Sequence, residues 1–280
     1  MQRNVSLKDK ENENNETHSL FYRKLVVSCL MIIAFAVCVN QAYGKVLPNT
    51  KLITKKYVYN AKANIVVRPK NTLTAEKYFR IYKIKKHDAV YKRIKGKSFK
   101  ESGKMPLSNL RYLKVLYVGF DGKSHIGEII VNQKIANKTK TVFLQLYRAK
   151  YQIKSMELID DYYKKRGEDG NKADWRSMEA NNTSAFNYRY ITHTRNLSNH
   201  SWGRAIDLNP RQNPYSRKVN GIWRAIDHSP KLDKYAQNRS SAIPHVITKK
   251  DTAYKAFLKA GFFWGGNWSQ TPDYQHFEWR

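Results

Sequence analysis

Hydrophobic and polar positions form a clear pattern in the middle of the chain. Residues 110–118 (LRYLKVLYV) and 125–132 (HIGEIIVN) are rich in strand-forming residues, and the Asp121-Gly122 pair between them is a turn signal. These segments predict a β-hairpin. In residues 138–151, apolar side chains such as Val142, Leu146 and Ala149 recur at helical spacing, which predicts an amphipathic helix.

The C-terminal third shows a second helical pattern. Thr248 to Asp251 resembles a capping box and Gly261 suits the position after a helix end, so a helix of about three turns is predicted between them. Helices and strands do not alternate as in a doubly wound fold, which favours an α+β fold with a small antiparallel central sheet flanked by helices. Three weaker predictions are a strand at 153–159, a surface loop at 164–176, and the return of 262–279 to the central sheet.

The N-terminus has the order expected of an export signal. Residues 25–39 are uncharged and apolar, Arg23 and Lys24 precede them, and the small residues Ala42 and Gly44 follow. Residues 1–44 are therefore interpreted as a signal peptide, or as an uncleaved signal anchor in the membrane. Either interpretation predicts an exported protein, periplasmic or in the cell wall or extracellular space.

The remaining chain is predicted to have two parts and a strongly basic surface. Residues 45–84 are Lys-rich and are interpreted as a basic arm or linker, and residues 85–280 as the folded domain. After residue 44 the charge is +29, from 47 Lys and Arg minus 18 Asp and Glu. Such a charge attracts polyanions, including anionic cell-envelope polymers. Specific nucleic-acid binding is not expected, since no helix-turn-helix, RNA-binding or zinc-finger pattern is present. Both cysteines lie within the apolar N-terminal run, so a cysteine-based metal site beyond it is excluded.

Candidate chemistry concentrates near the C-terminus. His200 and Asp207 can meet at one point if they flank a strand-turn-strand, with Gly203 permitting a tight turn. His276 offers a third ligand. Imidazole nitrogens and carboxylate oxygens bind zinc at about 2.0–2.2 Å, and three protein ligands leave the fourth position open, as in catalytic zinc sites. A Zn²⁺ ion held by these three residues is therefore predicted.

The residues around these ligands carry a family resemblance. Residues 198–207 resemble the Ser-x-His-x-x-Gly-x-Ala-x-Asp signature of the zinc D-alanyl-D-alanine carboxypeptidase and L-alanyl-D-glutamate endopeptidase family. This family belongs to the LAS metallopeptidases and includes vancomycin-resistance D,D-peptidases and phage endolysins. The resemblance covers about residue 85 to the C-terminus. Further matching stretches are residues 183–189, 209–215, 261–268 and 273–278.

The resemblance implies a role for each site residue. It implies a LAS/hedgehog-like fold and zinc ligation by His200, Asp207 and His276. Asp273, three residues before the last ligand, matches the catalytic base; Glu278 is the rival base, or a hydrogen-bond acceptor that orients an imidazole. Arg189 matches an arginine near the scissile carbonyl, where it stabilises an oxyanion or holds a substrate carboxylate. Ser198 either binds a substrate carboxylate or stabilises its turn.

The resemblance further implies hydrolysis of peptidoglycan stem peptides. Family members that cut L-Ala-D-Glu commonly have Asp at the base position, and those that trim terminal D-Ala commonly have Glu, so Asp273 favours the endopeptidase. Two alternatives stay open. One is a catalytically inactive module that binds zinc and cell-envelope polyanions; the other is a polyanion-binding structural protein without a metal.

Overall fold

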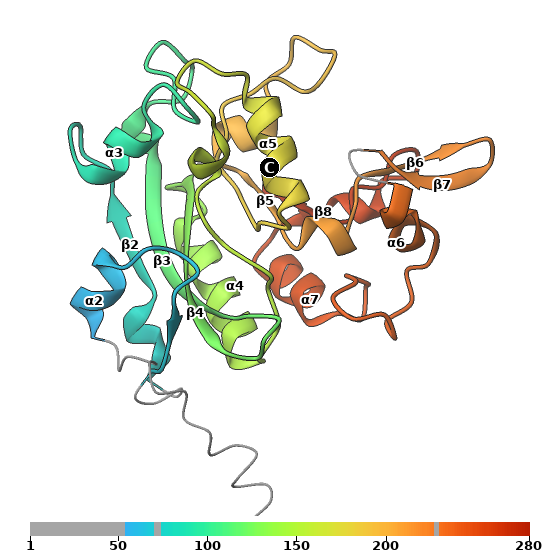
Figure 1. Ribbon diagram of the computed structural model, residues 1–280, viewed down its shortest axis with the longest axis horizontal. Coiled ribbons are helices and arrows are strands. Elements are labelled where there is room, and N and C mark those ends of the chain that lie inside the picture. The colour runs from blue at the N-terminus through green and yellow to red at the C-terminus, as the bar shows by residue number, and fades with distance from the viewer. Residues whose placement is uncertain (1–53, 70–73, 227–229) are drawn as a thin grey trace, which may run out of the picture. The chain divides into compact units, whose positions relative to one another are not determined.

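A four-stranded antiparallel sheet organises the first half of the described chain (Figure 1). The computed structural model describes residues 54–69, 74–226 and 230–280. Strands β3 and β4 form the predicted hairpin, in which Leu110 pairs with Asn132 at one end and Val118 pairs with Ser124 at the other. The hairpin is thus confirmed. In sheet order the strands are β1 (Val66–Val67), β4 (Ser124–Asn132), β3 (Leu110–Val118) and β2 (Arg80–Lys83).

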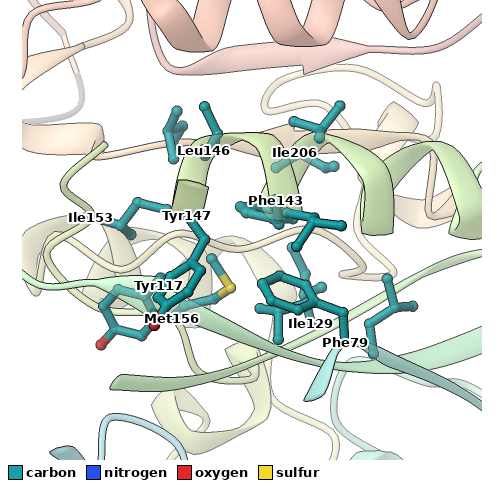
Figure 2. Packing of buried hydrophobic residues seen from close by; sticks show 14 of the residues in the cluster. Phe79, Tyr117, Ile129, Phe143, Leu146, Tyr147, Ile153, Met156 and Ile206 are labelled. Atoms are coloured by element: carbon teal, nitrogen blue, oxygen red, sulfur yellow. The ribbon is translucent and has the colours of Figure 1, made fainter. Parts of the chain in front are cut away.

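The predicted central helix covers one face of this sheet. Helix α4 (Ala136–Arg148) confirms the helix predicted from the apolar spacing, although it begins two residues and ends three residues earlier than predicted. Its Phe143 and Tyr147 point at the sheet and pack near Tyr117 and Met156 (Figure 2). These side chains are almost fully buried, so they form the centre of the main hydrophobic core.

Residues 54–69 and 74–84 are packed into this unit and do not form a separate arm. Strands β1 and β2 extend the sheet at both edges, and Tyr78 and Phe79 are 2% exposed. Helix α2 (Lys55–Asn60) is followed by its C-cap Ala61, whose carbonyl accepts a 2.6 Å hydrogen bond from the Lys114 ammonium group. The described part of the predicted arm is therefore structural, because its apolar residues complete the core and its strands pair the sheet edges.

A second, three-stranded sheet holds the C-terminal segment. Its antiparallel order is β5 (Ala205–Asp207), β9 (His276–Glu278) and β8 (Phe263–Trp264). The prediction that residues 262–279 join a central sheet is wrong, because these strands pair with β5 in a sheet of their own. The predicted C-terminal helix is present as α7 (Thr252–Lys259), with Asp251 as its N-cap. Phe257 on α7 stacks on Phe277 of β9 at 4.1 Å and lies edge-on to Phe143, which joins the two parts of the core.

Two local predictions are wrong. The segment interpreted as a surface loop contains helix α5 (Gly170–Glu179), which begins because Asp169 accepts a hydrogen bond from the Asn171 amide. Residues 153–159 form no strand and contribute a single bridge, between Ser155 and Asn182. The remaining elements are α3 (Ala89–Ile94), β6 (Ser216–Val219), β7 (Ile222–Ala225), α6 (Asp233–Gln237) and the 3₁₀ helices η1 (Ala75–Tyr78), η2 (Leu107–Asn109), η3 (Ile159–Tyr162), η4 (Asn199–Trp202), η5 (Pro210–Gln212), η6 (Pro230–Leu232) and η7 (Gly265–Asn267).

The fold class is α+β, as predicted, with small antiparallel sheets flanked by helices. The signal peptide or anchor predicted for residues 1–44 lies outside the described residues. Within the described ranges, no helix combines the length and the apolar character needed to cross a membrane.

Candidate metal centre and active site

The pairing of β5 with β9 places two of the predicted ligands opposite each other. Asp207 and His276 are direct cross-strand partners, so their side chains project from the same face of the second sheet. Ile206 and Phe277, the preceding pair, point to the opposite face and are fully buried in the core. The alternation of side chains along the strands therefore separates the face that carries the predicted ligands from the face that packs in the core.

His200 reaches the same point from a 3₁₀ turn. It lies in η4, and not on a strand as the strand-turn-strand prediction required. Gly203 ends η4 with φ of +61°, and a Cβ atom there would lie 2.7 Å from the Asn132 amide nitrogen. Glycine is needed at this position both for the left-handed backbone and for the close approach to β4.

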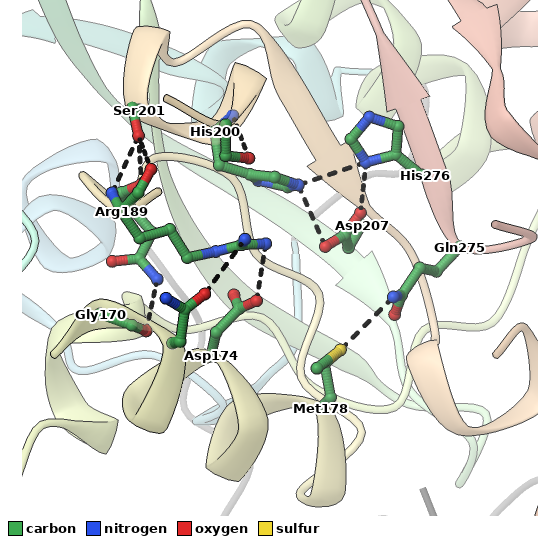
Figure 3. A network of polar contacts seen from close by, with 12 residues as sticks. Gly170, Asp174, Met178, Arg189, His200, Ser201, Asp207, Gln275 and His276 are labelled. Atoms are coloured by element: carbon green, nitrogen blue, oxygen red, sulfur yellow. Dashed lines mark hydrogen bonds and ion pairs between the residues drawn. The ribbon is translucent and has the colours of Figure 1, made fainter. Parts of the chain in front are cut away.

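The three side chains converge closely enough to hold a metal ion (Figure 3). His200 Nε2 lies 3.2 Å from Asp207 Oδ2 and 3.3 Å from His276 Nδ1, and His276 Nδ1 lies 3.1 Å from Asp207 Oδ1. Three ligands of a tetrahedral zinc ion with bonds of 2.0–2.1 Å are about 3.3 Å apart. The donor set and its spacing therefore fit zinc.

The hydrogen bonds behind each imidazole turn its other ring nitrogen toward the centre. His200 Nδ1 lies 2.6 Å from the Ala185 carbonyl oxygen, which only accepts, so the Nδ1 proton is fixed there and Nε2 faces the centre. His276 Nε2 lies 3.4 Å from Glu278, which leaves Nδ1 facing the centre. Glu278 thus occupies the predicted position of an acceptor that orients an imidazole, and it also accepts from Asn199 and Arg280.

The electrostatics of the three side chains are those of a paired, buried site. Burial alone would raise the pKa of Asp207, but the charges and hydrogen bonds of His200 and His276 hold it well below its usual range. Burial would lower the pKa of His276, but Asp207 and Glu278 raise it to about 10. The hydrogen bond from His276 lowers the pKa of Glu278 to about 2. Both carboxylates are therefore ionised at neutral pH, so Asp207 is available to a cation.

The centre opens into a pocket of about 810 Å³. All seven predicted site residues line it, although they come from four separate stretches of chain. Asp273 lies on the segment before β9, where its amide nitrogen donates to the Gly265 carbonyl and its carbonyl accepts from the His276 amide. The predicted base and the predicted ligands therefore share one cavity. The residues are Arg189, Ser198, His200, Asp207, Asp273, His276 and Glu278.

Arg189 is held rigidly beside the centre. Its guanidinium forms a 2.7 Å ion pair with Asp174 of α5, as Figure 3 shows. Its backbone is fixed as well. The Arg189 amide donates a 2.8 Å hydrogen bond to the Ser201 hydroxyl, and that hydroxyl donates to the Arg189 carbonyl at 2.6 Å. Since Ser201 lies in η4 next to His200, the arginine and the ligand are positioned by one turn.

Ser198 and Asp174 differ in how well the sequence indicated them. Ser198 is 6% exposed, is the N-cap of η4 and accepts a 3.3 Å hydrogen bond from the His200 amide, which supports the turn-stabilising interpretation. Asp174 was not predicted, because its segment was interpreted as a loop. The signal available was Asp169 before Gly170, an N-cap that begins the helix carrying Asp174.

One comparison with known proteins bears on this site. Residues 192–279 match the family model of D-alanyl-D-alanine carboxypeptidases. The match covers just under a third of the chain, and it includes His200, Asp207, Asp273 and His276. The searches of curated proteins and of solved structures gave no match. At the level of the family, the match supports a peptidase that acts on peptidoglycan peptides.

Proposed function

We propose that the protein is an exported zinc peptidase that hydrolyses peptidoglycan stem peptides, with the L-Ala-D-Glu bond as the preferred target and D-Ala-D-Ala as the second candidate. The observation that carries the proposal is the convergence of His200, Asp207 and His276 in the same pocket as Asp273 and Arg189. The family match to residues 192–279 supports it independently.

Each residue has a chemical role in this proposal. His200 Nε2, Asp207 and His276 Nδ1 hold the zinc ion, which supplies Lewis-acid polarisation and makes water more acidic. The Asp273 carboxylate takes a proton from the attacking water, whose oxygen forms a bond to the scissile carbonyl carbon. When the carbon–nitrogen bond breaks, Asp273 returns that proton to the leaving amine. The Arg189 guanidinium, fixed by Asp174, stabilises the negative charge on the carbonyl oxygen.

Export and envelope binding belong to the same proposal. The apolar run at 25–39 and the charge of +29 after residue 44 support a protein that works among anionic envelope polymers, either released after signal cleavage or held by an uncleaved membrane anchor. The alternative is a catalytically inactive module that binds zinc and envelope polyanions. Such a module has no need for a carboxylate at position 273, so Asp273 favours the peptidase.

Digestion of purified muropeptides followed by mass spectrometry tests the proposal. We expect the wild type to release products of L-Ala-D-Glu cleavage or to remove D-Ala. Asp273→Ala should keep one zinc per chain and lose hydrolysis by at least about a hundredfold, as is typical of a lost general base. His200→Ala should lose both.

His193→Ala is the matched control, since His193 is an exposed histidine of the same pocket outside the ligand cluster. It should keep zinc and activity. A wild-type protein that binds zinc and leaves every muropeptide intact would support the inactive module instead.

A further inference from the structure

The hairpin β6–β7 carries an arginine into the active-site pocket. Tyr215 and Arg217 line the pocket, whereas Ser216 and Lys218 do not. Alternate residues of a strand point to the same side, so the pocket face of this strand is set by its period of two. Asn220 and Gly221 at the tip have φ of +50° and +78°, as a two-residue hairpin turn requires.

The position of Arg217 relative to Asp273 is fixed by backbone pairing. Tyr215 forms a bridge with Asp273, and the Ser216 amide donates to the Pro272 carbonyl at 2.9 Å. Arg217 is two residues beyond Tyr215, which corresponds to about 7 Å along the strand. One or two residues of an extended peptide can therefore span the distance between Arg217 and the predicted catalytic base.

The fold gives Arg217 a like-charged neighbour and no compensating ion pair. Its cross-strand partner is Arg224, and like charges in such a pair are destabilising. Arg224 is neutralised by Asp233 at 2.6 Å. Arg217 has no ion pair within residues 54–69, 74–226 and 230–280.

Other arginines of the pocket are already paired. Arg189 is held by Asp174 and Arg176 by Glu168, which is itself outside the pocket lining. Among the arginines that line this pocket in the described residues, Arg217 is therefore the one whose exposed guanidinium has no ion pair and can bind an anionic group on an incoming ligand. A guanidinium binds a carboxylate through two parallel hydrogen bonds, which gives selectivity over an uncharged amide.

We propose that Arg217 is a substrate-binding residue that recognises a carboxylate of the stem peptide next to the scissile bond. The inference rests on the proposed function, and it adds a specificity determinant on the hairpin. Two carboxylates have the required chemistry: the free carboxylate of D-Glu and the carboxylate at the peptide C-terminus.

The test compares a stem peptide with two amidated versions, one with a carboxamide at D-Glu and one with a carboxamide at the C-terminus. For the recognised carboxylate, amidation should raise the KM of the wild type roughly tenfold with little change in kcat, as for one charged hydrogen-bonded pair. Arg217→Gln should raise the KM for the unmodified peptide by a similar factor and leave the KM for that amide unchanged.

Lys218→Gln is the matched control, because it removes the same charge from the adjacent residue, which does not line the pocket. It should behave as the wild type on all three peptides. Equal KM values for wild type and Arg217→Gln would overturn the inference, and so would an equal loss on acid and amide.

Binding measured by calorimetry separates this inference from the proposed function. In an Asp273→Asn background, the peptides bind without being cut, and the Kd values should show the same roughly tenfold discrimination through Arg217. If the wild type binds the peptides with this discrimination but cleaves none, the proposed function fails and the recognition stands. If the wild type cleaves them and Arg217→Gln changes neither KM nor Kd, the recognition fails and the function stands. Absence of any binding overturns both.

Discussion

At the scale of single residues, the centre is a cluster of polar groups that water barely reaches. His200, Asp207 and His276 are 2%, 2% and 7% exposed. Burying such groups is costly unless each finds a partner. Here the outward nitrogen of each histidine has its own acceptor, the Ala185 carbonyl or Glu278, and the inward atoms contact one another. The surrounding protein therefore fixes the orientation of each imidazole ring before a metal binds.

Asp174 provides a test of how the arginine is positioned. Asp174→Asn removes the charge that holds the Arg189 guanidinium while leaving every predicted zinc ligand in place. We expect kcat/KM on a stem peptide to fall roughly tenfold or more, because small displacements of a charge-stabilising group are expensive in the transition state. Zinc content, measured by elemental analysis, should not change.

Asp161→Asn is the control for this prediction. Asp161 is an exposed carboxylate that pairs with Arg93 and does not line the pocket. Thermal unfolding of both variants separates loss of positioning from loss of folded protein. Full activity of Asp174→Asn would show that the ion pair does not matter for catalysis.

At the scale of elements, sequence patterns correctly predicted those helices and strands that depend on interactions between residues close in the sequence. The β3–β4 hairpin and helices α4 and α7 follow from apolar spacing and turn residues close in the sequence. Helix α5 was missed because Gly167, Gly170 and many charges suggested a loop, although Asp169 caps the helix. Strands β5 and β9 are three residues each and pair across about 70 positions, so periodicity carries too little information to place them.

The site was indicated in a different way from the fold. The ligands and Asp273 were recognised from the signature around them, not from any prediction of their pairing. Asp174 and the Ala185 carbonyl could not be found this way, because their roles arise only when α5 and the segment before Arg189 fold against η4.

Gly203 tests the link between an element and the metal centre. Gly203→Ala places a Cβ 2.7 Å from the Asn132 amide nitrogen, in a left-handed conformation that disfavours side chains. We expect a loss of stability of about 3 kcal/mol or more, together with weaker zinc binding, because the turn carries His200 toward Asp207.

Gly221→Ala is a closely matched control. Gly221 also has a positive φ, but nothing lies within 4 Å of a Cβ atom there. It should cost about 1 kcal/mol, the conformational term alone, and leave zinc affinity unchanged. Chemical denaturation and a competitive zinc titration measure the two effects. Equal costs for the two variants would contradict the role assigned to the β4 contact.

At the scale of the whole molecule, the site depends on elements well outside the segment that matches the peptidase family. The match begins at residue 192, yet Ala185 orients His200, and Asp174 and Arg189 come from α5 and the segment after it. Gly203 packs against β4, which in turn is paired with β1 and β3. The sheet built by the first half of the described chain therefore acts as the support on which the matched segment assembles its centre.

Global stability also depends on a buried carboxylate that does not line the pocket of the candidate site. Asp160 is 1% exposed and accepts hydrogen bonds from the Ser98 amide and hydroxyl at 3.0 and 2.9 Å. Burial raises the pKa of Asp160 to about 6, even though Ser98 opposes the shift. A carboxyl group with a raised pKa in the folded state binds protons more tightly than in the unfolded chain. Its contribution is therefore fully present below about pH 4 and is lost as the pH rises toward 6.

Asp160→Asn isolates that contribution, because the amide mimics the protonated acid at every pH. The stability of Asp160→Asn minus that of the wild type should increase by about 2 kcal/mol between pH 4 and pH 6.5 and level off above it, given the folded pKa of about 6. Urea denaturation at a series of pH values measures the difference. Asp161→Asn, which removes a charge from the adjacent and 42% exposed side chain, should show a much smaller change over the same interval. A difference for Asp160→Asn that is flat with pH would mean that the Ser98 hydrogen bonds balance the cost of burial, and one that falls as the pH rises would mean that they outweigh it.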